Sequence, residues 1–231
     1  MSTDIATRID QVQARIRRAA ESCGRDPASV RLVAVAKTFP AEDVRRAAAA
    51  GATDVGENYI QEAREKVEAL ADLGLRWHFI GHLQRNKAGQ AVRLFDLIHT
   101  VDSARLGAEI DRSAARMGKS QDVLVQVNVA GEATKSGVAP GEAAPLVREL
   151  SAMGALRVRG LMTMPPFFDE PERVRPFFAE LRRIAERIRA LGLPNVGMDE
   201  LSMGMTGDFE AAIAEGATLV RVGTAVFGGR S

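Results

Sequence analysis

The chain has 231 residues, of which 46% are hydrophobic and 26% charged, and its 31 Lys and Arg residues nearly balance 30 Asp and Glu residues to leave a formal net charge of +1. This composition is typical of a globular protein that buries a full core. It gives no reason to expect nucleic acid or an anionic membrane as a partner.

Cysteine content and the N-terminal residues both favour a reducing compartment. The single cysteine, Cys23, has no internal partner for a disulfide, and no cysteine cluster is available to bind zinc. The first 18 residues mix acids and arginines with apolar residues, unlike a signal peptide, and no apolar run reaches the length of a membrane span. We therefore expect one domain, residues 1–231, in the cytoplasm.

The chain opens with the pattern of an amphipathic helix. Apolar residues recur at spacings of three and four, and Gly24 follows the last of them. We predict a helix that ends near this glycine. The apolar stripe consists of Ile5, Ile9, Val12, Ile16 and Ala19.

Short apolar runs follow this helix, and helical patterns separate them. Strands that alternate with helices imply right-handed crossovers and a parallel sheet. Eight such strands match a closed barrel better than an open sheet. We therefore predict an α/β fold, a single (β/α)8 TIM barrel with an additional N-terminal helix. The eight runs are residues 30–36, 53–57, 77–81, 97–102, 123–129, 158–164, 200–205 and 219–223.

The last two strands of the predicted barrel are followed by loops rich in small residues. In a TIM barrel these two loops lie at the functional face and commonly bind phosphate. Hydroxyls and accessible N–H groups before a helix N-terminus favour an anion. Either loop alone is better explained as a tight turn, but two such loops at one place predict a phosphate site. The candidate residues are Ser202, Met203, Gly204, Thr206 and Gly207 in the first loop, and Gly223 and Thr224 in the second.

Two basic residues accompany these loops. The first run, VRLVAVA, leads into Lys37, and a lysine in such a place usually points into water. Arg221 lies between valines in the eighth run, and a buried guanidinium needs partners, either in a structural salt bridge or on a ligand. Barrel closure makes the eighth strand a neighbour of the first, so the two residues come together. A partly desolvated lysine near a cation has its neutral amine favoured, and a neutral amine attacks a carbonyl to form a Schiff base.

A phosphate site, a cationic donor and a nucleophilic lysine together describe a site for a phosphorylated aldehyde. Pyridoxal 5'-phosphate fits all three, with its aldehyde at Lys37, its phosphate at the two loops and its pyridine nitrogen at Arg221. A guanidinium there opposes protonation of the nitrogen and weakens the ring as an electron sink. Asn58 is either a ligand of the ring oxygen or a helix N-cap. His78 and His82 have the spacing of a metal pair, but that spacing suits a helix and not a strand end, so we expect no metal.

Motifs along nearly the whole chain resemble the pyridoxal phosphate homeostasis protein family, whose members are similar to the barrel domain of bacterial alanine racemase. The matching stretches are LVAVAKTFP, VGENYIQEAREK, WHFIGHLQRNK, VDS, VLVQVNVAGEATKSG, RGLMTM and LSMGMTGDFEAAIAEGATLVRVGTAVFG. Val55, where many relatives have Phe, is a small departure.

The resemblance implies a protein that binds, buffers or delivers pyridoxal phosphate, with apoenzymes as recipients. It implies a role in keeping amino-acid and vitamin B6 pools in balance, without an established reaction. The site residues that it implies are Lys37 as bearer of the cofactor, Arg221 at the pyridine nitrogen, Asn58 beside the ring, and Ser202, Gly204, Gly223 and Thr224 at the phosphate.

Three functions stay open from the sequence. They are a carrier of pyridoxal phosphate, an amino-acid racemase of the alanine-racemase type, and a Schiff-base aldolase that attacks a phosphorylated sugar directly. A racemase needs a second base on the opposite face of the cofactor, which the family resemblance assigns to a tyrosine from an additional β-domain. The only tyrosine here, Tyr59, follows the second run, and nothing in the sequence places it there. We therefore favour the carrier and expect a monomer.

Overall fold

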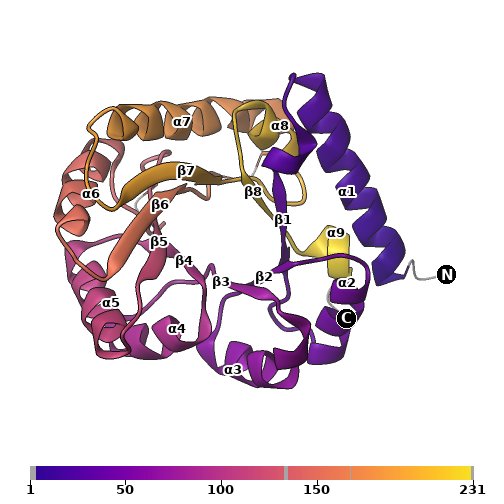
Figure 1. Cartoon of the computed structure of the whole chain (residues 1–231). Coiled ribbons are helices and arrows are strands. Elements are labelled where there is room, and N and C mark those ends of the chain that lie inside the picture. Colours follow the sequence, from indigo (N-terminus) through magenta and orange to yellow (C-terminus); the bar gives the residue numbers. More distant parts are fainter. Residues whose placement is uncertain (1–3, 133–134, 167, 230–231) are drawn as a thin grey trace.

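The strands of the protein close into a barrel. The computed structural model describes residues 4–132, 135–166 and 168–229. Within them eight parallel strands pair in chain order, and β8 returns to pair with β1 (Figure 1). The TIM-barrel prediction is therefore confirmed. The strands are β1 (Arg31–Val35), β2 (Asp54–Glu57), β3 (Arg76–Phe79), β4 (Leu97–Val101), β5 (Gln121–Gln126), β6 (Leu156–Met162), β7 (Val196–Ser202) and β8 (Leu219–Val222).

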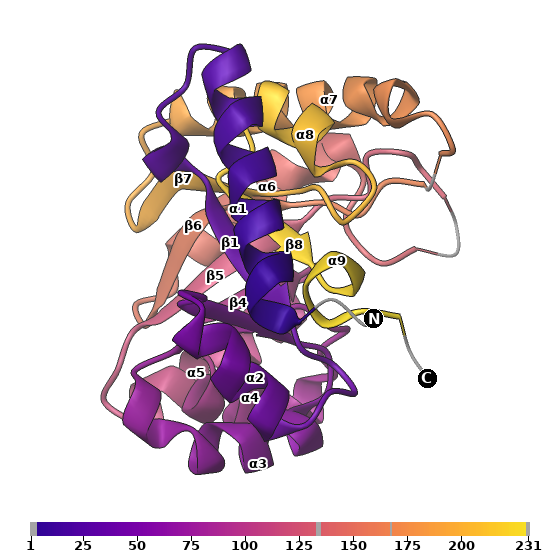
Figure 2. The ribbon, with the colours of Figure 1, turned by 90° about the vertical axis from the view of Figure 1, so that its right-hand side faces the viewer.

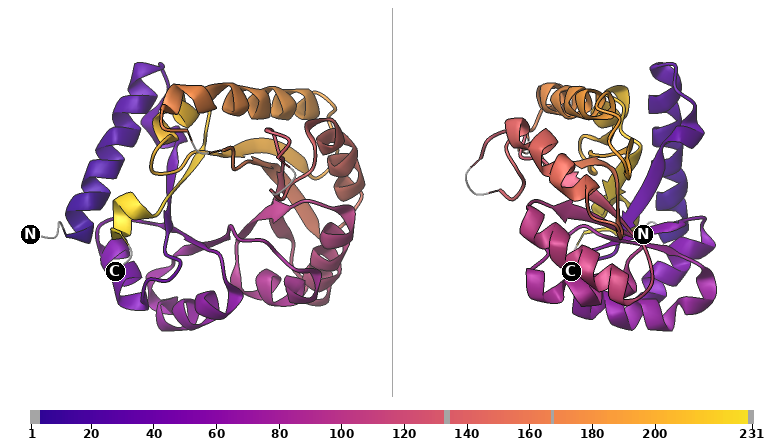
Figure 3. Two further views of the ribbon diagram at one scale, coloured as in Figure 1. Left: turned by 180° about the vertical axis from the view of Figure 1, so that it is seen from behind. Right: turned by 60° about the vertical axis from the view of Figure 1, so that its left-hand side comes forward.

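The helices form an outer ring around the strands (Figures 1 and 3). They are α1 (Ile5–Ser22), α2 (Ala41–Ala49), α3 (Ile60–Ala69), α4 (Ala88–Leu94), α5 (Ala104–Arg116), α6 (Ala143–Ser151), α7 (Arg175–Arg189), α8 (Phe209–Ala214) and α9 (Thr224–Phe227). Short 3-10 turns add η1 (Pro27–Ser29), η2 (Ala71–Leu73), η3 (Arg85–Lys87), η4 (Pro140–Glu142) and η5 (Pro171–Val174). None of the helices in the described part of the chain has the length and apolar character that crossing a bilayer requires.

The predicted N-terminal helix, α1, covers the side of the barrel where the chain ends. The last strand of the barrel, β8, is followed by α9, which has four residues and is too short to cover that side alone. Helix α1 contacts α2, α8 and α9, and Figure 2 shows it lying lengthwise beside them. Its buried face is the apolar stripe of the sequence, with Ala20 in place of the expected Ala19.

The interior of the barrel is partly apolar and partly polar. Five buried side chains, each from a different strand, form an apolar cluster of their own, separate from the larger core shared with the helices. Other interior positions carry buried charged or polar groups that the hydrogen bonds described below connect. The apolar cluster consists of Val33, Leu97, Leu124, Met162 and Leu219.

Strand β7 differs most from the prediction, which placed it at residues 200–205, whereas it spans Val196–Ser202. Its first half is only partly buried and contains polar residues, so it lacks the continuous apolar run of the other strands. Asn195 and Met198 have positive φ angles of 60°, and the pairing with β6 shifts register between Val158 and Gly160. These irregularities hide the strand from a search for periodic or apolar runs.

The contact between β6 and β7 generates a stability prediction. A Cβ atom at Gly160 would lie 1.8 Å from the backbone oxygen of Glu200, so Gly160→Ala forces the two strands apart. We expect the unfolding free energy to fall by about 1–3 kcal/mol, as for other overpacked cores. Gly154→Ala is the matched control, because an added Cβ there meets nothing within 4 Å. Urea unfolding of both variants measures the difference, and equal stability would contradict the prediction.

Candidate functional site

A cavity of about 410 Å³ lies at the carboxyl ends of the barrel strands. Its wall contains Lys37 from the end of β1, Asn58 from the end of β2, Arg221 within β8, and Gly223 and Thr224 after β8. The volume lies in the range of small-molecule sites. The structure therefore brings together these five residues, all of which the sequence singled out, and Thr206 and Gly207 line the same cavity.

The backbone around Lys37 is tied down on both sides. The N–H of Phe39 donates to the carbonyl of Ala36 over 3.1 Å, which makes Lys37 and Thr38 the centre of a tight turn. Thr38 has a φ of 69°, a left-handed conformation that is strained for a β-branched residue. Its N–H donates to Oε2 of Glu62 in α3 over 2.9 Å. The turn thus fixes where the lysine side chain leaves the barrel.

A buried ion pair between α3 and the end of β2 also holds this turn in place. Nζ of Lys66 in α3 donates to Oε1 of Glu57 over 2.6 Å and to the carbonyl of Ala36 over 2.7 Å. The other carboxylate oxygen of Glu57 is buried and accepts no hydrogen bond from the described residues. Burial raises the pKa of Glu57 above its ordinary value, and Lys66 opposes that rise. The ammonium group of Lys66 therefore supports both the backbone next to Lys37 and the buried carboxyl group of Glu57.

Arg221 is held in the cavity wall by strand β8, which pairs with β1. The side chain is 3% exposed, with Nη1 donating to Oγ of Ser202 over 2.6 Å and Nη2 donating to the carbonyl of Thr163 over 2.9 Å. Burial lowers its pKa to about 10, while the nearby carboxylate of Asp208 opposes the shift. The guanidinium stays charged at neutral pH, and two contacts fix its plane.

Two small-residue loops form another part of the wall, as predicted, but with a different division of residues. Thr206 and Gly207 line the cavity after β7, and Gly223 and Thr224 line it at the start of α9. The N–H groups in the first turn of a helix have no partner within that helix, so they are available to an anion. Asp208 shapes the first loop by accepting a hydrogen bond from the N–H of Met205 over 2.6 Å.

Ser202, Met203 and Gly204 lie behind this wall and not in it. The Ser202 hydroxyl is fully buried between Arg221 and His99, and the Met203 side chain belongs to the hydrophobic core. Gly204 has a φ of 92°, and its carbonyl accepts from the N–H of Arg221 over 3.0 Å. Phosphate contacts from these three residues stay a prediction.

Asn58 does not cap a helix. The N-cap of α3 is Tyr59, which makes no side-chain capping bond. A Cβ at Gly81 would lie 2.2 Å from the backbone oxygen of Asn58, so the end of β3 packs closely on this residue. Of the two interpretations that the sequence left open, the N-cap is wrong and the ligand stays a prediction.

Sequence reasoning missed an apolar wall and an acid. Met164 and Phe168, from the irregular stretch after β6, line the cavity together with Asp208, which directly precedes α8. The position of that stretch after a strand was the available signal. Burial raises the pKa of Asp208, although the N–H of Met205 and the charge of Arg221 lower it.

The side chains of His78 and His82, which have the spacing of a metal pair, lie in different parts of the barrel. His78 lies in the barrel interior, where its ring nitrogens contact Asp54 and His99, while His82 lines the cavity. In the part of the chain that the structure describes, no group of three or more His, Cys, Asp or Glu side chains is arranged to hold a metal ion.

This geometry has counterparts in known proteins. The model of the family described as alanine racemase, N-terminal domain, matches residues 8–231. The pyridoxal phosphate homeostasis protein of Pseudomonas aeruginosa is 47% identical over 230 residues, which cover 100% of this chain and 97% of that protein. The chain belongs to the pyridoxal phosphate homeostasis protein family. The relative of the same name from Aquifex aeolicus is 44% identical, over 96% of this chain and 97% of that protein.

Solved structures of PipY and of an alanine racemase share the fold. PipY of Synechococcus elongatus with pyridoxal phosphate bound has a TM-score of 0.85 and 38% identity, over 97% of this chain and 100% of that chain. Alanine racemase of Corynebacterium glutamicum has a TM-score of 0.69 and 18% identity, and the match covers 94% of this chain but 60% of that one. The second likeness shows the fold alone.

The ion pair below the lysine turn generates a pH-dependent prediction. Lys66→Met leaves the Glu57 carboxyl buried without its cation, so its pKa in the folded state rises further. A carboxyl group whose pKa is higher in the folded state than in the unfolded state stabilises the fold at pH values below its unfolded-state pKa. This contribution is lost as the pH rises through the folded-state pKa. We expect a loss of unfolding free energy of about 3–5 kcal/mol at pH 8 and a smaller loss at pH 5.

Urea unfolding at the two pH values measures this effect. The control is the double variant Glu57→Gln with Lys66→Met, which removes both charges and should recover most of the loss at pH 8. A loss that does not change with pH, or a double variant no more stable than Lys66→Met, would show that Glu57 is not the titrating group.

Proposed function

We propose that the protein binds pyridoxal 5'-phosphate through a Schiff base on Lys37 and acts in pyridoxal phosphate and amino-acid homeostasis by holding the cofactor for transfer to apoenzymes. The observation that carries the proposal is the joint placement of Lys37, Arg221 and the loop at Gly223 in one cavity. The family and the PipY structure with pyridoxal phosphate support the identity of the ligand.

The donor set of the cavity fits this ligand. A lysine amine, a buried guanidinium and N–H groups before two short helices match an aldehyde, an aromatic nitrogen and a phosphate, respectively. Met164 and Phe168 offer apolar surface to the face of a ring. Met164 is 38% exposed, so this apolar side of the cavity reaches the protein surface.

Arg221 limits the chemistry that the site supports. Pyridoxal phosphate supplies an electron sink when its pyridine nitrogen is protonated. A guanidinium with a pKa of about 10 is a donor that stays charged at neutral pH. Placed at that nitrogen, Arg221 donates a hydrogen bond and leaves no acid to protonate it. This favours holding the cofactor over activating it.

The racemase alternative requires a second base in the cavity. Tyr59 is 54% exposed and lines a neighbouring cavity with Gln84 and Lys87, apart from the one that contains Lys37. His82 and Asp208 line the Lys37 cavity and are the described groups that an experiment on racemisation would probe.

The assignment of Lys37 is tested by absorption spectroscopy and chemical trapping. Protein mixed with pyridoxal phosphate should gain a visible absorption band, and borohydride should fix the cofactor on the peptide that contains Lys37. Lys37→Ala should lose both the band and the label. Lys87→Ala, in η3 and outside this cavity, should keep both. A band that persists in Lys37→Ala, or a label on another peptide, would overturn the assignment.

The absence of robust catalysis is tested with single enantiomers. We expect protein loaded with pyridoxal phosphate and incubated with L-alanine to form no D-alanine at an enzymatic rate, which for most enzymes is about 1 s⁻¹ or faster. Chiral chromatography over time measures the product. Sustained turnover at that rate would establish the racemase in place of the carrier, and its loss in His82→Ala or Asp208→Ala would identify the second base.

A further inference from the structure

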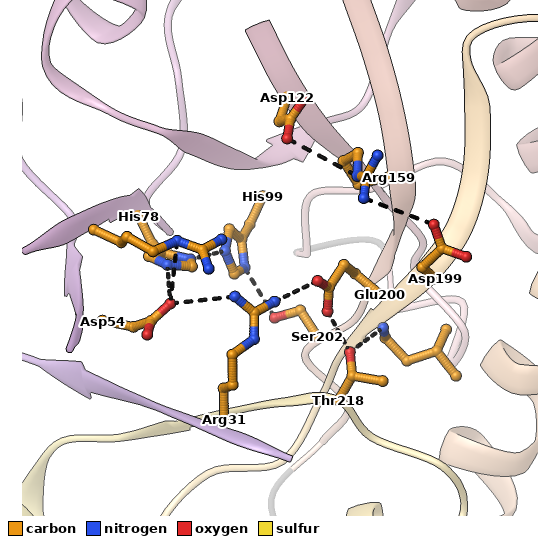
Figure 4. A network of polar contacts seen from close by, with 12 residues as sticks. Arg31, Asp54, His78, His99, Asp122, Arg159, Asp199, Glu200, Ser202 and Thr218 are labelled. Carbon is orange, nitrogen blue, oxygen red and sulfur yellow. Dashed lines mark hydrogen bonds and ion pairs between the residues drawn. The ribbon is translucent and has the colours of Figure 1, made fainter. Parts of the chain in front are cut away.

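Five polar side chains form an unbroken hydrogen-bonded chain through the interior of the barrel. Nη1 of Arg221 lies 2.6 Å from Oγ of Ser202, which lies 2.9 Å from Nδ1 of His99. Nε2 of His99 lies 2.8 Å from Nδ1 of His78, whose Nε2 lies 2.9 Å from Oδ1 of Asp54 (Figure 4). Each residue comes from a different strand, and none is more than 3% exposed. The chain runs from the cavity to the opposite end of the barrel, where β2 begins.

The chemistry of the two ends gives this chain one direction. A guanidinium only donates hydrogen bonds, so the Ser202 oxygen accepts, and its own proton goes to Nδ1 of His99. A neutral His99 then carries its proton on Nε2 and donates it to His78. By the same logic His78 donates from Nε2 to the carboxylate of Asp54. Every donor and acceptor along the path is used once, with both histidines neutral.

The charge states at the far end agree with this direction. Burial raises the pKa of Asp54, but hydrogen bonds from His78 and Thr53 outweigh it, so the pKa lies below its ordinary value and the group is ionised. Burial holds the pKa of His99 well below its ordinary value, with His78 and Arg221 adding to the shift. The chain thus has a cation at the cavity, a carboxylate at the far end and a neutral His99 between them.

Asp54 is itself fixed by the preceding residue, Thr53, and by the first residues of β1 and β3. Thr53 Oγ1 donates to Oδ2 over 2.8 Å, and Nη1 of Arg31 lies 3.5 Å from Oδ1. Arg76 lies 3.8 Å away through Nε. Figure 4 shows Arg31 reaching Asp54 on one side and Glu200 on the other. The acceptor that ends the chain is therefore held at both oxygens.

Packing alone does not require these groups. Bulky aliphatic side chains normally fill the interior of a TIM barrel, and apolar replacements of buried charged networks are often neutral or stabilising. A fully satisfied buried network instead fixes one arrangement of its members. The member that reaches the cavity is Arg221, so the arrangement that is fixed is that of its guanidinium.

We propose that Ser202, His99, His78 and Asp54 form a directional hydrogen-bond relay that sets the orientation of the Arg221 guanidinium toward the cofactor. The four are positioning residues, because they act through Arg221. This inference rests on the proposed function for the identity of the ligand, but the state of the histidines is a property of the protein without cofactor. It assigns the Ser202 hydroxyl to the ring-nitrogen side of the site.

The first test is nitrogen-15 NMR of histidine-labelled protein without cofactor. The chain has three histidines, and His82 lines the cavity mouth, so the other two signals belong to the relay. Around neutral pH both should be neutral and protonated on Nε2. A charged ring, or a proton on Nδ1 of either residue, would overturn the proposed direction.

The second test compares two replacements of His99. His99→Gln keeps an acceptor for Ser202 and a donor for His78, whereas His99→Leu has a similar size and neither group. In His99→Leu, His78 should no longer be restricted to one tautomer, and the visible band of bound pyridoxal phosphate should shift. Binding of pyridoxal phosphate should weaken about tenfold, equivalent to about 1.4 kcal/mol. His99→Gln should keep the His78 tautomer, the visible band and the affinity of the unmodified protein. Binding of inorganic phosphate, which competes only at the loops, should not change in either variant.

The outcomes separate the relay from the proposed function. A locked tautomer pattern in a protein that does not bind pyridoxal phosphate would overturn the proposed function and keep the relay. Normal cofactor spectrum and affinity in His99→Leu would overturn the positioning role and keep the proposed function. Equal loss of phosphate and cofactor binding in His99→Leu would show general damage to the site and also count against positioning. If His99→Leu does not fold, the tautomers of the unmodified protein still decide the direction.

Discussion

Pairing of β8 with β1 is the constraint on which the candidate site depends. The register sets Arg221 opposite Val33 and Val222 opposite Ala34, so Gly223 and Lys37 emerge at the same end of the barrel. The two basic residues lie in distant parts of the sequence, and no local segment contains both. Helix α1 packs on the side where these strands meet, and it protects the closure from water with its apolar stripe.

Buried charge near this closure is stabilised in two different ways. Lys66 and Glu57 form a compact pair whose cation also holds the backbone beside Lys37. Arg221 has no carboxylate in direct contact among its hydrogen-bond partners in the described residues, and its charge is instead linked through neutral groups to Asp54. The surface ion pairs of the helices are exposed and contribute little by comparison. The site is therefore built on interior electrostatics.

The sequence predicts the barrel because most of its strands are buried on both faces and read as apolar runs. It also predicts the meeting of Lys37 with Arg221, which needs only the closure of the barrel. It does not predict β7 well, because Asp199 and Glu200 interrupt the apolar pattern in a strand whose first half is only partly buried.

Other misses come from contacts between strands. Ser202 has the same appearance in the sequence whether its hydroxyl faces a loop or the barrel interior, and only the structure places it between Arg221 and His99. The contact between His78 and His99 depends on the register of β3 against β4, which no pattern within either strand encodes. Residues that act across strands are therefore the part of the site that a single sequence hides.

Thr38 gives the lysine turn a mechanical property. A β-branched residue in the left-handed region stores about 1–2 kcal/mol, and bonds to α3 through Glu62 and Lys66 hold the turn in that form. The strained conformation of this turn is therefore maintained by one helix on the outside of the barrel, α3. The position of Lys37 therefore depends on contacts with a helix on the outside of the barrel, whereas the position of Arg221 depends on contacts in the barrel interior.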